Sequence, residues 1–250
     1  MEVRIDHGAE GSRSARSLSV TMRTPGHDFE LAAGFLMTEG ILTHREEIDR
    51  IEFCGPAAPG RDTSNIVKVV LAPSVRVDLG TLERNFYTTS SCGICGKASL
   101  DALHVQGLQR PAASHPRLAR ASIHELPDRL GAAQPLFHST GGLHAAGLVE
   151  ADGTVRDVRE DVGRHNAVDK LLGRRFLDGA TPLGDHPMVV SGRASFEIVQ
   201  KALAAGVPMI VAVGAPSSLA VDLARRFGMT LVGFASRERF NVYCGHDRIM

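Results

Sequence analysis

The chain has 250 residues, 43% of them hydrophobic, which is enough for one large domain or two smaller ones with a sizeable core. Its 28 basic and 28 acidic residues give a formal net charge of zero, so the overall charge argues against a nucleic-acid or membrane-surface partner. No apolar run reaches the roughly 18 residues of a transmembrane helix. Residues 1–16 lack the apolar centre of a signal peptide, so we expect a cytoplasmic protein.

The first half of the chain predicts a mixture of strands and helix. A strand is expected at 18–22, and apolar residues at helical spacing predict an amphipathic helix over 28–41, with Asp28 and Glu30 at its N-terminal end. The β-branched run at 66–71 predicts another strand, which residues 75–79 continue beyond a turn.

The motif Cys92-Gly93-Ile94-Cys95 is the most informative feature of the first half. Two cysteines at this spacing suit half of a zinc site, a thiol-disulfide couple, or a persulfide carrier with a second thiol to resolve it. The flanking serines, glycines and Lys97 indicate an exposed loop that runs into a helix, where buried filler cysteines are rare. A helix N-terminus and a nearby lysine both favour the thiolate, so the setting indicates a nucleophile.

The alternatives for this motif are weaker. Structural zinc needs four ligands, whereas Cys54 and Cys244 are solitary and His104 is the one histidine soon after the motif, so we predict no metal site. A thioredoxin-like motif commonly has an aromatic residue before it and a proline inside it, and both are missing here. A zinc deaminase pattern is partly matched by residues 44–46, but Ser91 stands where that pattern requires proline.

The second half alternates strands and helices. Residues 109–124 are rich in Pro, Arg, Ala and Ser without a period and predict a linker, which places a soft boundary near residue 115. The predicted strands are 143–149, 155–160, 188–191, 209–213 and 230–234, and the predicted helices are 166–172, 196–205 and 219–227. We therefore expect an α/β fold with a mostly parallel sheet flanked by helices over 116–250, and a smaller N-terminal α+β part over 1–115 that ends in the Cys-x-x-Cys loop and helix.

Polar clusters follow several of these strands. Residues 160–170, 191–195 and 213–218 each stand before a predicted helix, where they could bind an anion or simply begin the helix. Residues 234–243 combine arginines with aromatic side chains, which can hold phosphates and stack on a purine or pterin.

Five segments together resemble the formate dehydrogenase accessory sulfurtransferases, the FdhD family. The matching segments are 30–36 with 39–40, 91–97, 160–170, 191–193 and 239–243. The resemblance implies that Cys92 accepts sulfur as a persulfide from a cysteine desulfurase and passes it to a molybdenum cofactor, Mo-bis(molybdopterin guanine dinucleotide), for formate dehydrogenase. Cys95 would assist or resolve the persulfide.

The same resemblance implies the remaining properties. It assigns cofactor binding to Phe234, Ala235, Ser236, Arg237, Glu238 and Arg239. It also implies a homodimer with a cytidine-deaminase-like main domain, and the catalytic subunit of formate dehydrogenase as a partner. The alternative function is a chaperone that binds the molybdenum cofactor without transferring sulfur.

Overall fold

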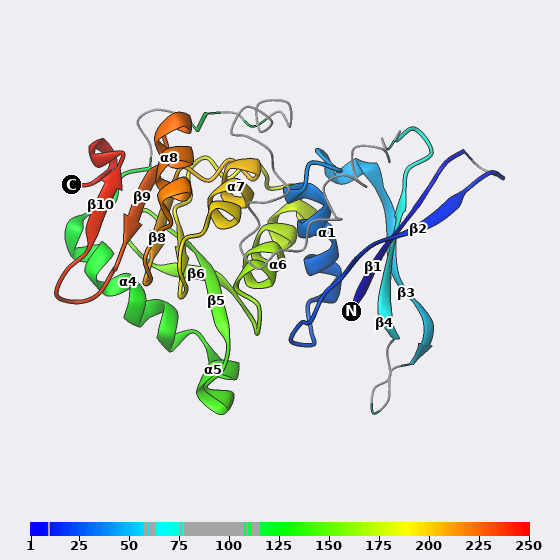
Figure 1. The fold of residues 1–250 in the computed structure, drawn as a ribbon, viewed down its shortest axis with the longest axis horizontal. Coiled ribbons are helices and arrows are strands. Elements are labelled where there is room, and N and C mark those ends of the chain that lie inside the picture. Colours follow the sequence, from blue (N-terminus) through cyan, green and yellow to red (C-terminus); the bar gives the residue numbers. More distant parts are fainter. Residues whose placement is uncertain are drawn as a thin grey trace.

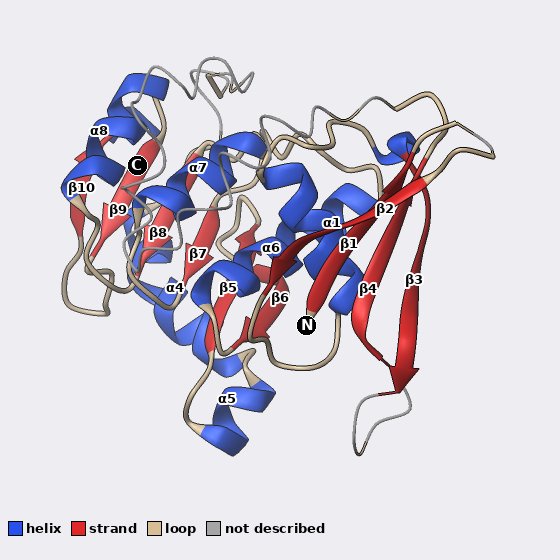
Figure 2. Ribbon diagram, turned by 45° about the vertical axis from the view of Figure 1, so that its right-hand side comes forward, coloured by secondary structure: helices blue, strands red, loops and turns tan. Residues whose placement is uncertain are grey.

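A computed structural model describes residues 1–9, 11–57, 60, 64–75, 77, 108, 110–111 and 116–250. The described strands form two β-sheets that lie next to each other, with helices between them and around the larger sheet (Figures 1 and 2). This is the α/β fold that the sequence predicts. Cys92 and Cys95 lie outside the described residues, as does most of the strand predicted at 75–79.

The smaller sheet belongs to the N-terminal part and has the strand order β2-β1-β4-β3. Its strands are β1 (Glu2–His7), β2 (Ser14–Val20), β3 (Ile48–Ala57) and β4 (Ser64–Leu71). Alternating residues such as Val3 and Ile5 of β1 and Val67 and Val69 of β4 are buried, as expected for a sheet with one covered face. Helix α1 (Asp28–Thr38) and a short 3-10 turn, η1 (Arg45–Glu47), lie between β2 and β3 in the chain.

The larger sheet has the strand order β10-β9-β8-β7-β5-β6. Its strands are β5 (His144–Val149), β6 (Val155–Asp161), β7 (Met188–Val190), β8 (Met209–Ala212), β9 (Thr230–Gly233) and β10 (Asn241–Cys244). The expectation of a mostly parallel sheet is wrong, because only the pairs β7–β8 and β8–β9 are parallel. Short connections such as the turn at Asp152 and Gly153 between β5 and β6 can only join antiparallel strands.

Helices cover both faces of the larger sheet. Helices α6 (Arg164–Leu177), α7 (Phe196–Ala204) and α8 (Ser218–Phe227) pack on one face, and α4 (Arg120–Ala132) packs on the other. Val189 and Val211 face α4, whereas their neighbours Val190 and Ile210 belong to the core on the α6–α8 side. Strands buried on both sides are apolar throughout, which is why they read as continuous runs in the sequence. No described helix has the length and apolar character needed to cross a membrane.

The predicted linker is wrong from Arg120 onward, because α4 begins there. Ile123, Leu126 and Leu130 are buried at helical spacing and pack on the sheet, but Pro127 inside the helix weakens the sequence signal. Strands β1, β3 and β10, the short helix α5 (Pro135–Thr140) and the 3-10 turn η2 (His246–Arg248) are further elements that the sequence did not predict. The cytidine-deaminase likeness of this part stays a prediction.

Helices α1 and α6 join the two halves of the molecule. Gly34 of α1 and Gly173 of α6 face each other so closely that a Cβ on Gly34 would overlap the backbone oxygen of Asp169. A Cβ on Gly173 would likewise overlap the backbone oxygen of Glu30. Only glycine permits this approach of two helix backbones. The Glu30–Leu36 segment is therefore explained by packing between the halves.

Candidate functional site

The polar clusters that the sequence singled out meet at one edge of the larger sheet. Parallel strands β7, β8 and β9 end at this edge, and β6 ends there too, because Asp161 pairs with His144 at the start of β5. Backbone hydrogen bonds connect the loops that follow the strands: Gly214 N donates to Gly192 O at 3.0 Å, and Phe234 N donates to Gly214 O at 3.2 Å. We call this region the carboxyl edge. It is the position where α/β sheets commonly bind ligands.

Asp161 has a structural role at this edge. Its buried carboxylate accepts hydrogen bonds from Thr24 N at 3.0 Å, Gly163 N at 2.9 Å and the Asn166 side chain at 2.9 Å. It also lies 2.7 Å from Lys170 Nζ, whose side chain is 1% exposed. The charges of this group are fully paired, so they hold the segment around Thr24 against the start of α6.

Glu160 and Asp169 are also explained by internal contacts. The Glu160 carboxylate accepts hydrogen bonds from Leu136 N at 3.0 Å and Phe137 N at 2.7 Å, which stabilises the N-terminal turn of α5. Asp169 lies 2.9 Å from Lys201 Nζ inside the protein. Burial opposes a charge on Lys201, but the carboxylates of Asp169 and Glu39 outweigh it and raise the lysine pKa.

Arg164 remains without such a structural explanation. The Arg164 Nε atom is buried and has no hydrogen-bond partner in the described part of the chain. Gly192 lies beside it, since a Cβ at Gly192 would be 3.6 Å from Arg164 Cδ and 3.4 Å from His144 Nδ1. A buried donor without a partner is costly, so this guanidinium is a candidate for binding a ligand acceptor.

The two imidazoles at the carboxyl edge are held neutral. Burial lowers the pKa of His144, and the positive charges of Arg164 and Arg193 lower it further. Burial is also the main cause that lowers the pKa of His165 to about 4, and its Nε2 atom lies 3.2 Å from the Ser195 hydroxyl. The positive charge near these rings at neutral pH therefore comes from the arginines. Guanidinium groups bind phosphate and carboxylate oxygens well.

Apolar side chains are exposed next to these arginines. Phe234 is 43% exposed, and its φ angle of 53° is uncommon for a residue other than glycine. Val213 in the neighbouring loop is 37% exposed. Backbone strain of this kind tends to occur at functional positions. Together the exposed ring and the arginines suit a ligand with both a flat aromatic group and negative charge.

The structure divides the predicted cofactor-binding stretch between two places. Phe234 and Ala235 belong to the carboxyl edge, and Ala235 is buried, with its N–H donating to Ala212 O at 3.1 Å. Residues 236–239 form a turn, closed by Ser236 N donating to Arg239 O at 2.9 Å. Within this turn, Arg237 pairs with Asp128 of α4.

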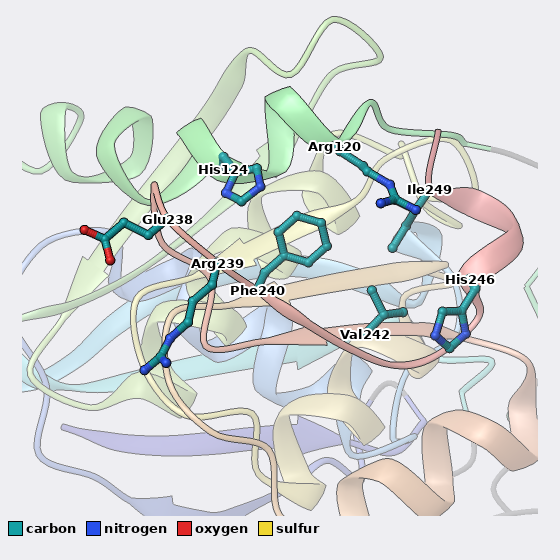
Figure 3. A pocket seen from close by; sticks show the side chains of 8 residues that line it. All are labelled: Arg120, His124, Glu238, Arg239, Phe240, Val242, His246 and Ile249. Carbon is teal, nitrogen blue, oxygen red and sulfur yellow. The ribbon is translucent and has the colours of Figure 1, made fainter.

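Glu238 and Arg239, the last two residues of that stretch, line a separate groove beside α4 (Figure 3). This groove lies between α4 and β10, on the face of the sheet that α4 covers. Phe234 and Arg239 are therefore placed toward different surfaces. Whether either surface binds a cofactor stays a prediction.

Of the four cysteines, the two that the structure describes are Cys54 and Cys244. Cys244 is buried, its thiol donates to Met229 O at 3.2 Å, and burial raises its pKa, so it is a core residue. Cys54 lies half-buried on β3. Among the described residues, no group of three or more His, Cys, Asp or Glu side chains is arranged to hold a metal ion.

Several site residues were not singled out from the sequence. His144 reads as part of an apolar strand, and its position is known only once β5 is placed between β6 and β7. Arg120 falls inside the stretch that was predicted to be a linker. Arg164 belongs to the polar segment 160–170, but its difference from the paired residues Asp161 and Lys170 depends on contacts that no local pattern reveals.

Comparison with known proteins places these features in a family context. The sequence profile of the FdhD/NarQ family matches residues 12–250. Proteins named sulfur carrier protein FdhD from Streptomyces coelicolor and Mycobacterium tuberculosis are 54% and 50% identical to the chain over 239 and 236 residues. The alignments cover 94% and 93% of this chain and 84% and 86% of those relatives.

A solved structure is similar over the whole chain. It is the crystal structure of a protein assigned as a formate dehydrogenase accessory protein from Desulfotalea psychrophila. The sequence identity is 28%, the TM-score is 0.69, and the match covers 100% of this chain and 90% of that one. The overall fold is therefore similar to that of this protein.

Proposed function

Since the chain belongs to the FdhD/NarQ family, we propose that it is a sulfur carrier that serves the maturation of formate dehydrogenase. The observation that carries this proposal is the 54% identity to a named sulfur carrier protein over 94% of the chain. At this level of identity and coverage, both the fold and the polar segments of the carboxyl edge are expected to be retained. The sulfur-carrying residue is proposed to be Cys92, with Cys95 as its assisting thiol.

The sulfur is taken up by thiol exchange. The Cys92 thiolate attacks the outer sulfur of a persulfide on a cysteine desulfurase, and a new S–S bond forms at Cys92. The S–S bond in the desulfurase breaks at the same time, and its cysteine leaves as a thiolate. No electrons are gained or lost overall. Lys97, two residues beyond the motif, supports the thiolate form of the attacking cysteine.

The sulfur acceptor is proposed to be the molybdenum cofactor, Mo-bis(molybdopterin guanine dinucleotide), which is a substrate of this protein. Its phosphates are negatively charged and its guanine and pterin rings are flat. Arg164 and Arg193 at the carboxyl edge suit the phosphates, and exposed Phe234 suits a ring. The buried, unpartnered Nε of Arg164 supports this assignment.

The proposed partners follow from this cycle. A cysteine desulfurase supplies the sulfur, and the catalytic subunit of formate dehydrogenase receives the modified cofactor. We also propose that the protein is a homodimer. In a non-catalytic chaperone, by contrast, cofactor would bind without any sulfur on Cys92.

Mass spectrometry tests the sulfur-carrying step. After incubation with a cysteine desulfurase and cysteine, the wild-type protein should gain about 32 Da, one sulfur atom, on the peptide that contains Cys92. The Cys92→Ala variant should lack the adduct and should fail to restore formate dehydrogenase activity in a deletion strain. Cys244→Ala is the matched control and should keep both. An unmodified Cys92 in the wild type, together with retained cofactor binding, would favour the chaperone.

A further inference from the structure

An open groove lies between the start of α4 and strand β10, at the border of the larger sheet (Figure 3). Its volume is about 380 Å³, and we call it the β10 groove. The residues that line it are Arg120, His124, Glu238, Arg239, Phe240, Val242, His246 and Ile249. They come from α4, β10, the turn before β10 and the C-terminal end of the chain.

The floor of the β10 groove is apolar and packs against the core. Phe240, Val242 and Ile249 are partly buried and pack against the core under α4. The rings of His124 and Phe240 lie 4.8 Å apart at an angle of 59°. His124 Nδ1 donates to Ser236 O at 2.9 Å, which fixes the imidazole in place. The floor is therefore preformed for an apolar side chain.

The arginines of the β10 groove differ from those of the neighbouring surface. On the other side of His124, Arg129 pairs with Glu125 at 2.5 Å, and Arg237 pairs with Asp128. Within the described part of the chain, neither Arg120 nor Arg239 has such a carboxylate partner. The carboxylates of α4 thus neutralise Arg129 and Arg237, whereas Arg120 and Arg239 are left available to an external anion.

The charged groups stand at opposite ends of the groove. Figure 3 shows Arg120 and Arg239 on either side of Phe240, with His246 on the same side of Phe240 as Arg120. Glu238 is the one acidic residue among the lining residues. Such an arrangement is complementary to an elongated ligand that has an apolar centre and carboxylates on both sides.

We propose that the β10 groove is a docking site for an extended acidic peptide segment of a partner protein. One apolar side chain of the segment rests on Phe240 and Val242, and its flanking carboxylates bind Arg120 and Arg239. A peptide fits better than a small molecule, because an open groove encloses little of a small ligand. Extended segments commonly bind beside the edge strand of a sheet, and β10 is an edge strand. The site goes beyond the proposed sulfur transfer and does not depend on it.

Fluorescence anisotropy with the full chain tests this proposal. The probe is a fluorescein-labelled hexapeptide with two acidic residues on each side of two central apolar residues. The wild-type protein should bind it, and Arg120→Glu should weaken binding by about tenfold or more, because one attraction becomes a repulsion. His246→Glu, on the side of the groove that the C-terminal end of the chain forms, should weaken it as well. Both residues are exposed, and circular dichroism checks that the variants fold.

Arg117→Glu is the matched control, because Arg117 is exposed, lies three residues before Arg120 and does not line the groove. This control should bind the acidic peptide like the wild type. Equal weakening by Arg117→Glu and Arg120→Glu would overturn the proposal, as would no binding to the wild type or equal binding of a peptide with lysines in place of the acids. Displacement of the peptide by GDP would also overturn it and would make the groove a nucleotide site. None of these outcomes affects the sulfur adduct on the peptide that contains Cys92, so the sulfur-carrier proposal is tested separately.

Discussion

The α1–α6 junction and Arg164 at the carboxyl edge both place charged side chains inside the protein, but only at the junction does each of these charges have a partner. At the junction, Glu30 pairs with Arg159 and Asp169 pairs with Lys201, and the helices meet through facing glycines. At the carboxyl edge, the buried Nε of Arg164 has no described partner, and apolar side chains are exposed. The difference shows that the partners of a charged residue, more than its presence in a motif, separate structural from functional roles.

The largest expected effect is at the junction. Gly34→Ala adds a methyl group that overlaps the Asp169 backbone, so α1 and α6 must move apart, and the free energy of unfolding should fall by about 4 kcal/mol. Urea unfolding measures the loss. Gly131→Ala in α4 is the control, because nothing lies within 4 Å of its Cβ position, and it should stabilise the protein by up to about 1 kcal/mol. If both variants behaved alike, the close helix contact would be wrong.

A second large effect is expected for the paired charges next to the carboxyl edge. Asp161→Asn leaves Lys170 buried without a carboxylate, which should cost about 3 kcal/mol of unfolding free energy. Asp178→Asn removes an exposed ion pair with Arg174 at the far end of the same helix and should leave stability nearly unchanged. A small loss in Asp161→Asn, measured by urea unfolding, would mean that Asp161 is itself available for a ligand.

Arg164 should show the reverse pattern, with a loss of binding and little loss of stability. Arg164→Gln should raise the dissociation constant for GDP, used as a probe of the dinucleotide, by about tenfold, which corresponds to about 1.4 kcal/mol. Titration calorimetry measures the change. Arg174→Gln, at the other end of α6, serves as the control. Unchanged GDP affinity together with a marked loss of stability would show that Arg164 has a structural role and does not bind the ligand.

The smallest effect concerns the neutral imidazole of His165. Its pKa is about 4 in the folded protein and 6.5 for a free side chain. As the pH falls from 6.5 towards 4, the imidazole is therefore protonated in the unfolded chain but stays neutral in the folded one, which lowers the free energy of unfolding. Because the side chain is 36% exposed, the resulting loss of stability at pH 5 is about 1 kcal/mol. The fall in unfolding free energy between pH 7 and pH 5 should be smaller in His165→Gln. An equal fall in both proteins would show that His165 is charged when folded.

Much of the secondary structure follows from local sequence patterns. The helices at α1, α6, α7 and α8 and the strands at β4 to β9 were predicted within a few residues, because each has a clear apolar period or a buried apolar run. The expected strand at 18–22 overlaps only the end of β2. Helix α4 was missed because its polar, proline-containing sequence hides the spacing of Ile123, Leu126 and Leu130.

The sequence by itself determined the family, the α/β class and a candidate nucleophile in the Cys92–Cys95 motif, because these depend on residue types at fixed spacing. Only the tertiary structure decided which charges are paired. Asp161 and Arg164 are charged residues of the same polar segment, but Asp161 is paired with Lys170, whereas the Nε atom of Arg164 has no described partner. It also decided the direction of the outer strands and placed Arg239 opposite Arg120. Pairing and burial depend on residues far away in the chain, and local patterns carry no information about them.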